Sequence, residues 1–232
     1  NLPARTEGLT YKDAYYDVDA WIEANRKFIL KTDPDMYFMI DAPVIGAGQV
    51  HDILGTVAMK WPGGTLPDNT PFQFVEGEYM LQSEYDHLLA DPSDFLLRVF
   101  IPRIFKNLEG FAQLPPLQSL ALGCYGTPVY GMAMANPNVL EALQRLMEMS
   151  KHAMNYAGKV GQFHAQFAEE GQVCACAAPT LHPYDLISDM LRGMRGTMLD
   201  MFQVPDKLIA AMERFYPLML GIAVNVAQAT GN

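Results

Sequence analysis

The stretch that most constrains the fold runs from Gln172 to Asp200. It opens with a short apolar run of small residues, Val173 to Ala178, which lies between Gly171 and Pro179. A polar, helix-compatible segment follows at once and carries His182, Asp185, Asp189, Arg192 and Arg195. This order predicts a buried strand, a loop and a helix. Because loops after the C-terminal ends of barrel strands collect ligand-binding and catalytic groups, we expect the functional site here.

Charge and composition narrow the classes of partner. The chain of 232 residues is 50% hydrophobic and 18% charged, which is typical of a folded domain with a sizeable core. Its net charge is −10 and its pI is near 4.8. These values argue against nucleic acid and against an anionic membrane surface, since both need clustered Lys and Arg. We therefore expect small molecules or other proteins as partners.

Cysteine content and hydropathy indicate a cytoplasmic setting. There are only three cysteines, and the sequence opens without a secretory pattern. The most apolar segment, Leu218 to Ala229, is too short to span a bilayer, so we predict a buried helix end and no membrane contact. For the 15 methionines, gap filling in the core is favoured over an adaptable apolar pocket.

Hydrophobic periodicity and capping residues predict an α/β protein with a mostly parallel sheet. Thr10, with Asp13 three residues later, is placed to cap the first helix, and the pair Asp91-Pro92 starts another. The expected helices cover residues 11–30, 81–90, 92–106 and 139–169 and a last helix from Pro205; the expected strands cover 36–40, 72–75, 117–122 and 173–178.

The residues from Ala178-Pro179 through Leu191-Arg192-Gly193 resemble the uroporphyrinogen decarboxylase superfamily. Met39-Ile40-Asp41 is similar to that family's strand-end aspartate, and Asn136-Pro137 stands before the helix that leads to the Ala-Pro strand. The resemblance is diffuse over most of the chain and sharpest over residues 172–217. It implies a TIM (β/α)₈ barrel, with 1–232 forming a single partial barrel domain, because eight strands do not fit this length beside such long helices.

The same resemblance implies an enzyme, and two departures favour one branch of the superfamily. The arginine-rich motif that binds substrate propionates in the decarboxylases does not occur before Asp41, and Asp189 stands where they carry a tyrosine. A carboxylate there would repel a substrate with eight carboxylates. The expected function is therefore a corrinoid-dependent methyltransferase that moves a methyl group to a thiol. The alternatives are uroporphyrinogen III decarboxylase and a non-catalytic binding subunit.

Candidate site residues follow from the resemblance and from residue chemistry. The resemblance gives Asp41 a substrate-binding role; capping of the following turn is the alternative. His182 is either a general acid or base, or a plain hydrogen-bonded loop residue. Asp185 and Asp189, four residues apart, share a helix face, where they would interact or bind a cation. Asp41, His182 and Asp189 are the expected catalytic residues.

Four further residues are expected to bind substrate: Tyr184, Asp185, Arg192 and Arg195. The two arginines suit a carboxylate or phosphate, or else pair with the neighbouring aspartates. Cys174 and Cys176 face one side of a strand, with His164 as the only upstream candidate for a shared zinc site, and buried thiols are favoured instead. No metal site is assigned. By resemblance alone, zinc and a corrinoid are candidate cofactors, and a corrinoid protein and a second copy of the chain are candidate partners.

Overall fold

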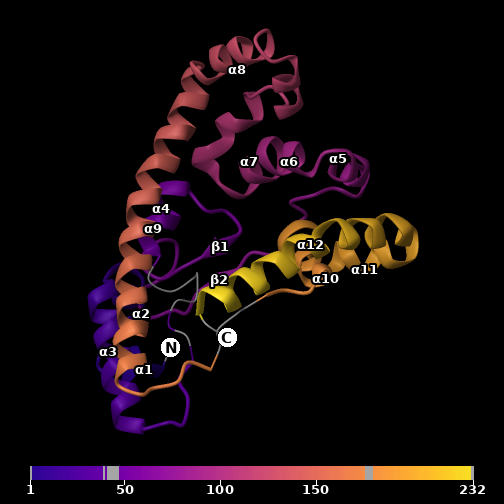
Figure 1. Ribbon diagram of the computed structural model, residues 1–232. Helices are drawn as coiled ribbons and strands as arrows, with labels where there is room; N and C mark the ends of the chain where they lie inside the picture. Colours follow the sequence, from indigo (N-terminus) through magenta and orange to yellow (C-terminus); the bar gives the residue numbers. More distant parts are fainter. Residues whose placement is uncertain (1, 39, 41–46, 176–179, 231–232) are drawn as a thin grey trace. The chain divides into compact units, whose positions relative to one another are not determined.

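The computed structural model describes residues 2–38, 40, 47–175 and 180–230 (Figure 1). The chain divides into two compact units. Unit 1 comprises Asn1–Phe74 and Leu146–Ala177, and unit 2 comprises Val75–Arg145 and Ala178–Asn232. Each unit has its own hydrophobic core.

Unit 1 begins with three helices, and side-chain caps start the second and the third. Thr10 and Asp13 form the predicted capping box, in which Thr10 Oγ1 accepts from Asp13 N at 3.0 Å and Asp13 Oδ2 accepts from Thr10 N at 2.8 Å. Asp17 then caps a new helix by accepting from Ala20 N, so the single helix expected over 11–30 is divided in two. The elements are α1 Leu2–Thr6, α2 Tyr11–Tyr16, α3 Val18–Thr32, α4 Gly48–Leu54, β1 Met59–Lys60 and β2 Gln73–Phe74.

The core of unit 1 forms between its first helices and the C-terminal half of the long helix α9 (Pro137–Glu169). Trp21 and Ile29 of α3 pack with Phe163 and Phe167 of α9. A second, smaller cluster joins Tyr15 to Met59 and Trp61. The helix predicted over 139–169 is confirmed and begins two residues earlier.

Unit 2 consists of short helical segments and two longer helices. Asp91 accepts from Asp94 N, and Pro92 is the first helical residue, as predicted. The core of unit 2 contains Tyr85, Phe95, Ile187, Leu191 and Phe215. The elements besides α9 are η1 Gln82–Glu84, α5 Tyr85–Ala90, α6 Pro92–Phe95, η2 Leu96–Phe100, α7 Ile101–Ile104, η3 Lys106–Gln113, η4 Leu117–Leu122, α8 Gly126–Met134, α10 Pro183–Leu186, η5 Ile187–Arg192, α11 Gly193–Gln203 and α12 Pro205–Thr230.

The prediction of an α/β fold and of a partial TIM (β/α)₈ barrel is wrong. The structure is mostly helical (72%), and the described residues contain a single sheet, in which β1 and β2 pair antiparallel. The segment 117–122, expected as a strand, is a 3₁₀-helix. A short apolar run has no periodicity that separates a buried strand from a buried helix, which is why this assignment failed.

The described residues of the segments expected as strands 36–40 and 173–178 pair at one position. Tyr37 N donates to Val173 O at 2.9 Å, and Ala175 N donates to Tyr37 O at 2.7 Å. This is an isolated parallel bridge between Tyr37 and Cys174. An isolated bridge is not the extended ladder of a parallel barrel sheet, and no such ladder is found in the described residues.

Helix α12 differs from the expected buried helix end. Leu218, Leu220, Ile222 and Val224 are all exposed. By length and composition alone, the stretch Pro205–Gln228 would be able to cross a membrane, and 17% of its most apolar window is buried. Its first half packs into unit 2 through Leu208 and Phe215, so this test is weak evidence for a membrane span.

Candidate functional site

The segment expected to carry the site folds as three helical pieces of unit 2: α10, η5 and α11. Pro183 is the first residue of α10, where its missing N–H costs no hydrogen bond. The middle piece, η5, is a π-helical turn, a form that recurs at functional sites. Gly193 follows with φ 71° and ψ 156°, a backbone conformation that is essentially restricted to glycine.

Arg192 is held inside the unit by a buried carboxylate. Its Nε–H donates to Asp200 Oδ2 at 2.6 Å, its Nη2 donates to Asp200 Oδ1 at 3.1 Å, and its Nη1 donates to the Met80 carbonyl at 2.6 Å. The residue is 3% exposed. These contacts favour a structural role over substrate binding, and the paired aspartate is Asp200 instead of the expected Asp185 or Asp189.

Asp200 is the centre of this network. Tyr85 Oη and Gln82 Nε2 both donate to it at 2.9 Å. Burial by itself would raise the pKa of Asp200, but the hydrogen bonds from Arg192, Gln82 and Tyr85 outweigh burial and hold the pKa below its usual value. For Tyr85, burial and the bond to Asp200 raise the pKa.

His182 caps the start of α10 and is exposed. Its Nδ1 accepts a hydrogen bond from Tyr184 N at 3.2 Å, so we assign the proton of the neutral ring to Nε2. The Tyr184 hydroxyl donates to the Met201 sulfur at 3.5 Å. The two residues therefore place an N–H donor and an aromatic ring at the same end of α10.

Asp185 of α10 and Asp189 of η5 are both exposed. Asp189 Oδ1 accepts from Ser188 Oγ at 3.0 Å. The Arg195 residue is exposed, and its backbone N–H donates to Glu76 Oε1 at 3.3 Å. No ion pair among the described residues joins Arg192 or Arg195 to either aspartate.

An exposed apolar surface lies next to these polar groups. We call it the methionine surface; it comprises Met190, Met194, Met198, Met201 and Phe202. Phe202 is 85% exposed. Among the described residues nine methionines are exposed, so the expectation that methionines fill gaps in the core is wrong for these nine.

Asp41 and Cys176 lie outside the described residues. Cys174 is half-buried in the bridge with Tyr37, whose hydroxyl is 2.7 Å from His164 Nδ1. In the part of the chain that the structure describes, no group of three or more His, Cys, Asp or Glu residues is placed to hold a metal ion. The described residues thus do not form a zinc site.

A polar cluster in unit 1 is formed by Tyr16, Asp52 and Trp61. The Tyr16 hydroxyl donates to Asp52 Oδ2 at 2.7 Å and accepts from Trp61 Nε1 at 3.1 Å. Burial and the Asp52 bond raise the pKa of Tyr16 to about 12. Tyr16 belongs to α2, Asp52 to α4, and Trp61 directly follows β1. These residues are far apart in sequence, and no sequence motif links them.

His51 lies against this cluster, with its ring centroid 5.1 Å from that of Trp61. Its Nδ1 is 3.1 Å from Thr56 Oγ1, and its buried Nε2 has no hydrogen-bond partner among the described residues. Burial lowers the pKa of His51 to about 4, with a smaller opposing effect from Asp52. The ring is therefore neutral at physiological pH.

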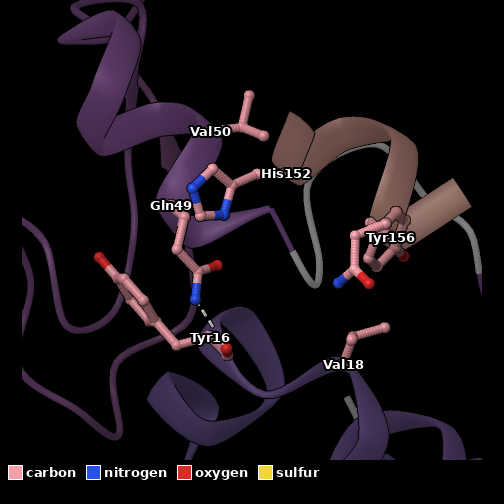
Figure 2. A pocket seen from close by; sticks show the side chains of 7 residues that line it. Tyr16, Val18, Gln49, Val50, His152 and Tyr156 are labelled. Atoms are coloured by element: carbon pink, nitrogen blue, oxygen red, sulfur yellow. Dashed lines mark hydrogen bonds between the residues drawn. The ribbon is translucent and has the colours of Figure 1, made fainter. Parts of the chain in front are cut away.

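A small pocket of unit 1 lies beside the same helices. Figure 2 shows Gln49 of α4 reaching toward Tyr16, whose carbonyl accepts from Gln49 Nε2 at 2.8 Å, with His152 and Tyr156 of α9 nearby. The cavity has a volume of about 60 Å³. That is room for about four water molecules, so this pocket is too small for a corrinoid or a porphyrin.

The geometry thus leaves the polar groups of α10 and η5, together with the methionine surface, as the candidate site. Comparisons with protein-family models, with curated proteins and with solved structures give no match to this chain.

Proposed function

We propose that this chain is a methyltransferase that moves a methyl group from a corrinoid to a thiol. The sequence resemblance over residues 172–217 supports this class of reaction. The structure adds one observation that carries the choice between the branches: the carboxylates of Asp185 and Asp189 are exposed, while Arg192 is fully engaged with Asp200. This surface would repel the eight carboxylates of uroporphyrinogen.

The methionine surface suits a large macrocycle. A corrin ring presents broad apolar faces and a rim of amide side chains, and flexible methionines adapt to such a shape. The Nε2–H of His182 is available to donate to an amide carbonyl at that rim, because Nδ1 is occupied by Tyr184 N. His182 is thus proposed as a binding group, since its free nitrogen already carries a proton.

Asp189 is the proposed proton acceptor. In this transfer a bound methylcorrinoid would supply the methyl group, and the thiol would lose its proton as its sulfur accepts that group. Ser188 Oγ donates a hydrogen bond to Asp189 Oδ1. Asp189 Oδ2 would accept the thiol proton and pass it to solvent.

The test is turnover of the purified chain with methylcobalamin and 2-mercaptoethanol. We expect loss of the methyl–cobalt absorbance together with formation of the methyl thioether, and a rate about 100-fold lower for Asp189→Asn. Glu213→Gln, which removes an exposed carboxylate of α12, is the matched control and should keep the wild-type rate. Release of carbon dioxide from uroporphyrinogen, or an unchanged rate for Asp189→Asn, would contradict the proposal. Corrinoid binding without turnover would favour a non-catalytic binding subunit.

A further inference from the structure

Helix α11 carries three methionines on one face. Met194, Met198 and Met201 follow one another at spacings of four and three residues, so on a helix with 3.6 residues per turn they fall within about 60° of arc. Side chains at such spacings have Cβ atoms roughly 5 to 6 Å apart. The helix itself therefore fixes this arrangement. We call these three residues, which are part of the methionine surface, the thioether triad.

The opposite face of α11 holds the helix in unit 2. Gly196, Thr197 and Asp200 on that face are buried. The triad lies away from it: Met194, Met198 and Met201 are 62%, 55% and 49% exposed. These three methionines therefore do not fill the core of unit 2, and their thioethers are open to a ligand.

A contact within unit 2 positions one of the three sulfur atoms. The Tyr184 hydroxyl of α10 donates to Met201 Sδ at 3.5 Å. A thioether sulfur has two lone pairs, so this bond leaves one of them for a ligand. Because the bond restricts the Met201 side chain, less conformational entropy is lost when its sulfur binds.

Thioether sulfur selects a particular class of metal ion. It is a soft ligand that prefers Cu(I), whereas Mg²⁺ and Ca²⁺ prefer oxygen ligands. It also binds without losing a proton, unlike a cysteine thiol or a protonated histidine. The methionine side chain has three rotatable bonds, so three sulfur atoms at this spacing can converge on one ion. The net charge of −10 further favours a cation over an anion.

We propose that the thioether triad binds one soft monovalent cation, Cu(I), through the sulfur atoms of Met194, Met198 and Met201. This site differs from a zinc site, which uses Cys, His, Asp or Glu ligands. The proposal depends on thioether coordination alone and is independent of the proposed methyl transfer.

Titration of the full chain with Ag(I), a redox-stable ion with the same soft character, tests the proposal in a chloride-free buffer. In a chain labelled with ¹³C in the methionine methyl groups, we expect the triad resonances to shift together. The variant Met194→Leu/Met198→Leu/Met201→Leu should bind about one ion fewer per chain. Leucine conserves the volume and lacks the sulfur, so circular dichroism should show the wild-type helix content. The cysteine thiols are the same in both chains, so the difference reports the triad.

The matched control is Met132→Leu/Met147→Leu/Met154→Leu, which removes three exposed methionines of α8 and α9 and should keep the wild-type stoichiometry. Between pH 8 and pH 5 the dissociation constant of the triad should change less than about 3-fold, because thioethers do not titrate. Three results would overturn the proposal: wild-type stoichiometry in the triad variant, loss of the same ion in the control variant, or binding that weakens steeply as pH falls, which would indicate thiol or imidazole ligands.

Discussion

At the scale of single residues, the motif that carries the resemblance has a structural explanation. Leu191 is buried in the core of unit 2, Arg192 is paired with Asp200, and Gly193 adopts a backbone conformation that other residues avoid. The candidate site is therefore made by neighbours of the motif, chiefly His182 and Asp189.

Asp200→Asn should lower the free energy of unfolding by about 3 kcal/mol at pH 7, because buried Arg192 loses the carboxylate bonded to its Nε and keeps the Glu78 carboxylate at 3.8 Å. Urea denaturation measures this, and the exposed Asp189→Asn should stay within about 0.5 kcal/mol of wild type. The folded-state pKa of Asp200 is lowered, so its contribution is present above the unfolded pKa near 3.8 and is lost as pH falls through the folded value. The difference between wild type and variant should accordingly shrink below about pH 4.

The burial of His51 predicts a second pH dependence of stability, in a different pH range from that of Asp200. Its folded pKa of about 4 lies below the unfolded value of 6.5, so the unfolded chain binds the proton more readily and stability falls as pH drops from 6.5 to 4. The loss should approach about 3 kcal/mol, and His51→Gln should remove it. His152→Gln, an exposed histidine of α9, should keep the wild-type pH profile in the same denaturation series. An unchanged profile in His51→Gln would show that another group titrates.

At the scale of elements, local signals place helix starts well and helix interiors less well. Thr10, Asp91-Pro92 and Pro205 all start helices where the sequence predicts them. The π-helical turn η5 and the change of direction at Gly193 have no such local signal. The Leu191 carbonyl of η5 accepts a hydrogen bond from Met80 N, and these two residues are far apart in sequence. The join between η5 and α11 therefore depends on tertiary contacts.

Gly193→Ala tests that join. The substitution should cost about 1 to 3 kcal/mol of unfolding free energy, because φ 71° with ψ 156° strains any L side chain and the added Cβ would lie 3.2 Å from the Gly77 carbonyl. Gly131→Ala in α8 meets no atom within 4 Å and should stabilise by about 0.5 to 1 kcal/mol. Equal effects of the two substitutions on thermal unfolding would contradict the strained geometry.

At the scale of the whole molecule, net charge and its distribution determine association. With 26 acidic and 16 basic residues, two copies repel at low ionic strength. Added salt should therefore favour any self-association of the chain, since salt screens this repulsion. Sedimentation at low and high salt measures this, and weaker self-association at high salt would instead indicate contacts between oppositely charged residues.

The sequence by itself determined the helix caps, the long helix α9, the acidic character and the exposed polar groups of α10 and η5. Each of these depends on neighbours within a few residues or on composition. Only the tertiary structure decided that Tyr37 and Cys174 form a bridge, that Arg192 pairs with Asp200, and that His51 is buried beside Trp61. Each of these features depends on a second residue that is brought close only when the chain folds. Hydrophobic periodicity describes neighbours along the chain, so it does not identify that second residue.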